Sequence, residues 1–102
     1  MATNYPISLY DNMPDPTLSR SAGDTISISF HDDCEWCFED PDNCFNGQLP
    51  QAGHHDHGDG PYNNLSPVRN GTVSYNAVQS RGSCTCGGGI TTTAGHTITV
   101  NN

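Results

Sequence analysis

The 102-residue chain contains no Lys and only three Arg, whereas it has eleven acidic residues, so its formal net charge is −8. The three cations stand far apart in the sequence, at Arg20, Arg69 and Arg81. Recognition of a phosphate backbone or of an anionic lipid surface requires clustered positive charge. We therefore expect neither nucleic acid nor a membrane as a partner, which leaves a protein or a small ligand.

Large apolar residues are also scarce, because Leu, Ile, Val and Phe together make up 16 of the 102 residues. No apolar run approaches the roughly 20 residues that span a bilayer. The length suits a single domain, 1–102. With so few core-forming residues, we expect that domain to need disulfide bonds or a metal ion in order to fold.

Residues 1–11 lack the basic and apolar segments of a secretory leader. This pattern predicts a cytoplasmic protein or the mature form of an exported one.

Helical periodicity is absent, whereas apolar and polar residues alternate in several short segments. Such alternation is typical of half-buried strands in antiparallel sheets. Turn signals separate the segments, among them Asn70–Gly71 and three consecutive Gly at 87–89. We therefore predict an all-β fold, a small antiparallel Greek-key β-sandwich, with strands at 6–10, 25–30, 72–78 and 96–100 and shorter ones at 62–68 and 90–93.

The middle of the chain, about 38–67, is rich in Pro, Gly, Asn, Asp and His. Connections longer than about 12–15 residues are usually functional or disordered. We interpret this segment as a long irregular insertion into the sandwich.

Two cysteine pairs follow predicted strands. Cys34 and Cys37 come directly after the 25–31 strand, and Cys84 and Cys86 lie in the Gly-rich loop after the 72–79 strand. In a Greek-key sandwich the second and the penultimate strands run in the same direction, so the loops that follow them lie at the same pole. We therefore expect both pairs to meet there, and the pole also receives two histidines, His31 and His96.

Three chemistries are compatible with such a pole. Four thiolates suit tetrahedral zinc or iron, and a mixture of Cys with His31 or His96 suits zinc or copper. Disulfide bonds between the two pairs would link the same loops without a metal. A redox-active dithiol is disfavoured, because the acidic residues Asp32, Asp33 and Glu35 beside Cys34 raise the pKa of a thiol.

A second group of possible ligands consists of His54, His55 and His57. Histidines this dense can bind zinc, copper or nickel, although the simpler interpretation is a solvated polar loop. The acidic stretch at 39–47 suggests calcium, but its order is not that of an EF-hand, so we expect a solvated loop there too.

Two further residues have a plain and a functional interpretation. The odd cysteine, Cys44, is either a fifth ligand or a buried small hydrophobe beside Phe45. Trp36 is either a lid over a site or part of the core. We find no Ser nucleophile elbow and no set of catalytic Ser, His and Asp, so we expect no enzyme.

The strand phrases at 22–28, 71–75 and 95–100 resemble those of cupredoxin-like and immunoglobulin-like sandwiches. The resemblance implies that His31 and either Cys84 or Cys86 take the places of copper ligands. However, no His follows Cys86 before His96, and Met occurs only at positions 1 and 13. The resemblance therefore implies the fold more than blue-copper electron transfer.

These observations lead to three functional hypotheses. The first is a metal-binding β-sandwich whose loop cysteines hold a structural ion, with zinc as the first choice. The second is a disulfide-stapled acidic interaction module that binds through the 38–67 loop. The third is an electron carrier with copper or iron.

Overall fold

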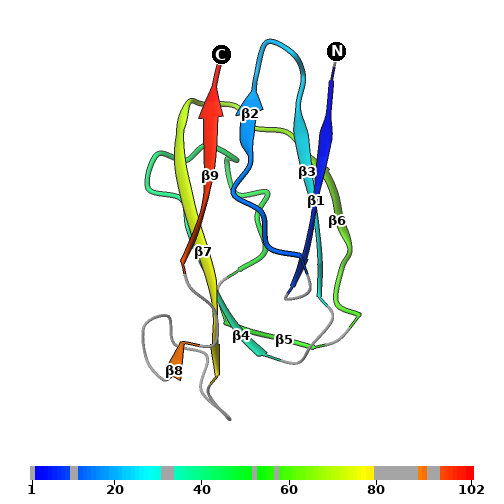
Figure 1. The fold of residues 1–102 in the computed structure, drawn as a ribbon, viewed down its shortest axis with the longest axis vertical. Helices are drawn as coiled ribbons and strands as arrows, with labels where there is room; N and C mark the ends of the chain where they lie inside the picture. Colours follow the sequence, from blue (N-terminus) through cyan, green and yellow to red (C-terminus); the bar gives the residue numbers. More distant parts are fainter. Residues whose placement is uncertain are drawn as a thin grey trace.

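Two mixed β-sheets account for the regular structure of the chain (Figure 1). The structure is a computed structural model that describes residues 2–9, 12–30, 34–51, 53–56, 58–79, 90–91 and 95–102. For residues 9, 34, 35, 54, 77–79, 90 and 91 it describes the backbone alone. Nine strands and no helix occur in these residues, so none of their segments is a helix that could span a membrane.

The first sheet has three strands in the order β1-β3-β6. β1 pairs with β3 in parallel, and β3 pairs with β6 antiparallel. The sheet is formed by β1 (Asn4–Leu9), β3 (Thr25–Phe30) and β6 (Tyr62–Leu65).

The second sheet follows the order β2-β9-β7-β4-β5, with β8 paired to β7. β2 runs parallel to β9, and the other pairs are antiparallel. Its strands are β2 (Thr17–Ser19), β4 (Cys34–Glu39), β5 (Gly53–His55), β7 (Gly71–Gln79), β8 (Ile90–Thr91) and β9 (His96–Asn101).

The all-β prediction is confirmed, but the purely antiparallel arrangement is wrong at two pairs. β1 and β3 run parallel because the chain between them leaves the first sheet and forms β2 in the second sheet. An alternating pattern determines which face of a strand is buried, but it carries no information on the direction of the neighbouring strand.

The insertion predicted at 38–67 is irregular only in part. It contains the end of β4 and the whole of β5 and β6. The shorter strand predicted at 62–68 is present in part as β6, whereas the Gly-His-His sequence of β5 is too short and polar to show alternation. Pairing of their backbones with β4 and β3 forms these strands instead.

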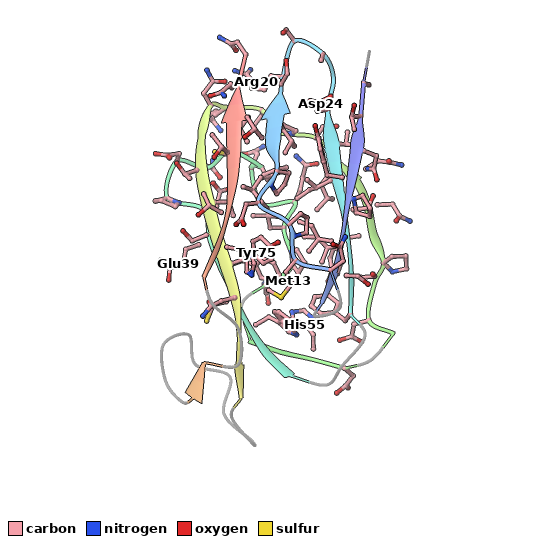
Figure 2. All side chains as sticks on the ribbon, viewed as in Figure 1. Met13, Arg20, Asp24, Glu39, His55 and Tyr75 are labelled. Carbon is pink, nitrogen blue, oxygen red and sulfur yellow. The ribbon has the colours of Figure 1, made fainter. Side chains whose placement is uncertain are left out.

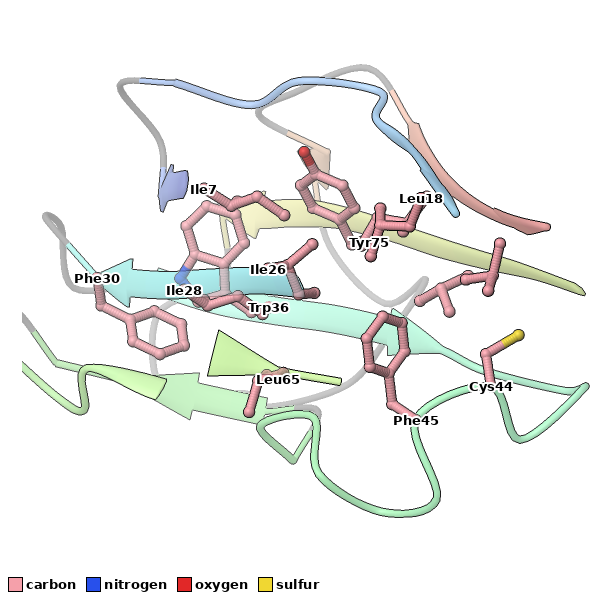
Figure 3. Packing of buried hydrophobic residues seen from close by; sticks show 13 residues of the cluster. Ile7, Leu18, Ile26, Ile28, Phe30, Trp36, Cys44, Phe45, Leu65 and Tyr75 are labelled. Carbon is pink, nitrogen blue, oxygen red and sulfur yellow. The ribbon is translucent and has the colours of Figure 1, made fainter. Parts of the chain in front are cut away.

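One cluster of buried side chains draws from both sheets (Figure 3). On β3 the alternation holds throughout, because Ile26, Ile28 and Phe30 are buried and the intervening hydroxyl residues are half-buried. Trp36 is fully buried and meets the edge of Phe30, with ring centroids 6.1 Å apart. Trp36 is therefore part of the core. The cluster consists of Ile7, Leu18, Ile26, Ile28, Phe30, Trp36, Cys44, Phe45, Leu65, Val73, Tyr75, Ile98 and Val100.

A buried carboxylate joins three strands at the end of the molecule where β1 begins and β9 ends (Figures 1 and 2). Asp24 lies just before β3. Its Oδ1 accepts the Thr3 N–H at 2.9 Å, and its Oδ2 accepts the Ser19 N–H at 2.9 Å. These hydrogen bonds hold the entrance of β1 and the exit of β2 against the start of β3. They also lower the pKa of Asp24, because both bonds favour the ionised form.

Candidate functional site

The pole at which we predicted the site corresponds to one end of the long axis of the molecule, which measures 41 Å. β3 and β7 both end there, and β4 begins there (Figure 1). We call this end the cysteine pole. The register pairs Glu35 of β4 with Val78 near the end of β7, so Cys34 lies beside the point where β7 leads toward Cys84 and Cys86. The backbone therefore brings the first cysteine pair to the exit of the strand that precedes the second pair.

Cys34 and Cys37 lie on a strand rather than in the loop that the sequence suggested. Both belong to β4, where Cys34 pairs with His55 of β5 and Cys37 pairs with Asn76 of β7. Cys37 is 4% exposed and forms a disulfide bond. The remaining predicted ligands at this pole, His31, Cys84 and Cys86, lie outside the described residues, as does the side chain of Cys34.

His96 stands at the first position of β9 and is half-buried against the core. Its imidazole stacks on Tyr75, with ring centroids 5.4 Å apart, and its Nδ1 lies 3.3 Å from Asp15 Oδ1. Nδ1 is itself buried and has no well-aligned hydrogen bond. The Nδ1 side of the ring therefore faces the Asp15 carboxylate.

Tyr75 and Asp15 hold the connection between β1 and β2 beside His96. The Tyr75 hydroxyl donates to the carbonyl of Pro14, and Asp15 Oδ1 accepts the Thr97 N–H at 2.7 Å. Burial, with a smaller contribution from the Asp15 charge, raises the pKa of Tyr75 well above its usual range. The phenol is therefore protonated at neutral pH and donates its hydrogen bond to Pro14.

The second histidine group has one described side chain, that of His55 (Figure 2). Its ring stacks on Phe30, with centroids 4.2 Å apart and an interplanar angle of 8°. Nε2 lies 2.7 Å from the Gln51 carbonyl oxygen and Nδ1 lies 3.5 Å from Asp59 Oδ2. Nε2 is thus held by a backbone carbonyl, whereas Nδ1 faces a carboxylate. The side chain of His54 and the whole of His57 lie outside the described residues.

The acidic stretch at 39–47 is a hydrogen-bonded turn and not only a solvated loop. The Asp40 carboxylate accepts the N–H groups of Cys44 at 2.7 Å and Phe45 at 3.0 Å. Asp42 Oδ2 accepts the Thr72 N–H at 3.1 Å. Because these oxygens already receive backbone donors, the two carboxylates organise the chain between β4 and β7.

Cys44 is the free cysteine among the residues that the structure describes, and it is fully buried in the core. Burial, helped by the nearby charge of Asp40, raises the pKa of the Cys44 thiol to about 11. The interpretation of Cys44 as a buried small hydrophobe is confirmed.

Within the described part of the chain, no group of three or more His, Cys, Asp or Glu side chains is placed to hold a metal ion. The zinc, copper or iron site predicted at the cysteine pole includes residues beyond that part and stays a prediction.

Sequence reasoning missed the roles of three residues, namely Asp15 and Tyr75 beside His96, and Asp24 at the opposite end of the molecule. Asp15 and Tyr75 bind residues 82 and 61 positions away, and Asp24 binds Thr3, 21 positions away, as well as the nearer Ser19, so no periodic pattern reveals these contacts. The only available signal is the Gly-Asp phrase at 23–24, which precedes a strand.

A scan against protein-family models, a search of curated proteins and a search of solved structures found no match to this chain.

Proposed function

We propose that this protein is a disulfide-stapled acidic β-sandwich that acts as a non-catalytic binding module. The observation that carries the proposal is the disulfide bond at Cys37. A cysteine in a disulfide has no thiolate to offer a metal, so the four-thiolate zinc site would require Cys37 to be reduced. The staple also meets the need for a covalent support in a chain with so few core residues.

We infer that the two sheets form a sandwich of the cupredoxin-like kind. The shared core cluster supports a face-to-face arrangement, because it contains residues of β1, β3 and β6 together with residues of β2, β4, β7 and β9. Immunoglobulin domains are built from antiparallel sheets. The parallel β1–β3 pair departs from that pattern and favours the other alternative.

Two of the other four cysteines can be excluded as the disulfide partner of Cys37. Cys34 lies three residues away on the same extended strand, a separation of about 10 Å. That distance exceeds the Cα separation of about 7 Å that a disulfide can bridge. Cys44 is a free thiol. We therefore infer that Cys37 pairs with Cys84 or Cys86, so that the staple joins β4 to the segment that follows β7.

The charge distribution supports a cationic partner. The net charge is −8, and the strands of the first sheet contain no charged residue. Among the described residues, four of the exposed carboxylates stand in the 38–67 segment, at Glu39, Asp42, Asp56 and Asp59, and a fifth is Asp15. A basic peptide or protein surface is the complement of such a segment, and its association rate would fall steeply with ionic strength.

The test is a thiol count combined with metal analysis on protein purified without a His tag. The denatured, non-reduced chain is expected to show fewer than five reactive thiols and no stoichiometric metal. Five thiols with one zinc per chain would overturn the proposal in favour of the zinc site, and an intense visible colour would favour the copper or iron carrier.

Two matched variants sharpen the thiol count. Cys37→Ser should release its partner and raise the count by one, whereas Cys44→Ala should lower the count by one. If Cys37→Ser lowers the count as Cys44→Ala does, Cys37 is a free thiol and the staple does not exist.

A further inference from the structure

Two copies of the same reactive dipeptide stand in different surroundings in this fold, Asn46–Gly47 and Asn70–Gly71. In Asn–Gly, the backbone nitrogen of Gly can attack the side-chain carbonyl carbon of Asn. A new C–N bond forms, the bond to the side-chain amide nitrogen breaks, and ammonia leaves. Water then opens the resulting succinimide to aspartate or isoaspartate. The step requires a Gly nitrogen that is free to move, which makes Asn thermolabile at such positions.

Gly47 satisfies this requirement. It occupies the third position of a tight turn in which the Gln48 N–H donates to the Phe45 carbonyl at 3.0 Å. The φ angles of Asn46 and Gly47 are 49° and 81°, as in a type I′ turn. In such a turn the fourth residue supplies the hydrogen-bonded N–H, so the Gly47 nitrogen is left unbound. Both residues are exposed, and a Cβ on Gly47 would meet nothing within 4 Å.

The backbone nitrogen of Gly71, in contrast, is not free to move. N–H groups point to alternate sides along a strand, and the Thr72 N–H points to Asp42 at 3.1 Å, away from β9. The Gly71 N–H therefore points toward β9, where Gly71 pairs with Val100. A Cβ on Gly71 would lie 2.5 Å from the Asp42 side chain, so the backbone there is tightly enclosed.

The side chain of Asn70 is held as well, because its Oδ1 accepts a hydrogen bond from Arg20 Nη1 at 3.2 Å. Asn46 Oδ1 also accepts a side-chain hydrogen bond, a longer one from Asn43 Nδ2 at 3.4 Å, so the main difference between the two pairs lies at the Gly nitrogen. Both reacting groups of the second pair are thus restrained by residues that are distant in sequence.

We propose that Asn46 is a site of spontaneous deamidation and that the fold protects Asn70. The modification would alter a turn that is anchored in the core, since Cys44 and Phe45, the residues just before Asn46, are buried there. Isoaspartate lengthens the main chain by a methylene group, and either product adds a negative charge close to Asp40 and Asp42. The modified chain should therefore lose the Phe45–Gln48 hydrogen bond.

The experiment incubates the folded protein in mildly alkaline buffer prepared with ¹⁸O-water and maps both sites by peptide mass spectrometry. Product is expected to accumulate at least about fivefold faster at Asn46 than at Asn70, because one hydrogen bond of typical net strength must break before Gly71 can react. The same incubation in denaturant should bring the two rates together, since the two dipeptides are identical.

Equal rates in the folded protein, or faster reaction at Asn70, would overturn the proposal. A ratio that is the same in folded and denatured protein would also overturn it, because the difference would then not come from the fold. Asn46→Gln should abolish most of the product in the folded protein, whereas Asn70→Gln should leave the total nearly unchanged. The comparison of folded and denatured wild type decides the question even if Asn46→Gln does not fold.

Discussion

At the scale of single residues, polar side chains of this protein act mainly on backbone groups. Asp24 and Asp40 each accept two backbone N–H groups, and Asp42 accepts one. Where the chain turns between strands, each carboxylate gives a backbone N–H the hydrogen-bond acceptor that water would otherwise supply. Acidic residues that look like a ligand cluster in the sequence are therefore occupied in part by the fold itself.

Asp24 makes the stability of the protein depend on acid pH. Its pKa is lowered in the folded state by the Ser19 and Thr3 hydrogen bonds, relative to an ordinary value of 3.8. The stability that it contributes is present above the ordinary value and is lost as the pH falls through the lowered native pKa. In Asp24→Asn, we expect a lower thermal midpoint at neutral pH and a weaker loss of stability on acidification. Glu39→Gln, at an exposed carboxylate, is the matched control, and equal acid profiles for wild type and Asp24→Asn would contradict the assignment.

The Cys44 thiol should be unreactive toward alkylating reagents in the folded protein. With a pKa of about 11, its thiolate fraction at neutral pH is about 10⁻⁴, and the thiolate is the reactive form. We expect peptide mapping after brief treatment with iodoacetamide to find Cys44 unmodified in native protein and modified in denaturant. Rapid native labelling of Cys44 would show that the turn at 40–48 opens readily.

At the scale of elements, the turn after β4 and the start of β7 are built against each other. Asp42 occupies the space beside Gly71, whose φ of 154° suits an unsubstituted residue. Gly71→Ala would place a Cβ 2.5 Å from Asp42, and such overpacking costs about 1–3 kcal/mol. Denaturant unfolding should show this loss, whereas Gly95→Ala, in open space, should be nearly neutral. Similar midpoints for both variants would mean that Asp42 moves aside freely.

The Tyr75 hydroxyl fastens the β1–β2 connection to the second sheet through Pro14. Tyr75→Phe keeps the packing of the ring and removes this one donor, which should cost about 1 kcal/mol. Tyr62→Phe is the control, since Tyr62 also packs partly buried against the core and its hydroxyl makes no hydrogen bond with the described residues. Chemical denaturation measures both, and an equal effect of the two substitutions would deny Tyr75 this role.

At the scale of the whole molecule, the proposed staple ties together parts of the chain that are almost fifty residues apart. Closing a loop of that length stabilises a protein by about 4 kcal/mol in the chain-entropy description. Reductant should therefore lower the thermal midpoint of the wild type markedly. Cys37→Ser should start from the lower midpoint and show no further response. A wild type that is indifferent to reductant would refute the staple without bearing on the deamidation of Asn46.

The sequence by itself determined the composition of the strands and the direction in which their side chains point. Alternation identified β3, β7 and β9 and most of their buried residues, because a strand with one buried face must carry that pattern locally. Scarcity of apolar residues likewise pointed to a covalent or metal support.

Only the tertiary structure decided the strand directions, the pairing of β5 and β6, and the roles of Asp15, Asp24 and Tyr75. These features depend on contacts between residues that are far apart in the sequence, and such contacts leave no periodic signal. The two Asn–Gly pairs are identical in sequence, yet the fold leaves one nitrogen free and turns the other toward a neighbouring strand. The sequence determines which groups can react, whereas packing determines which of those groups are free to do so.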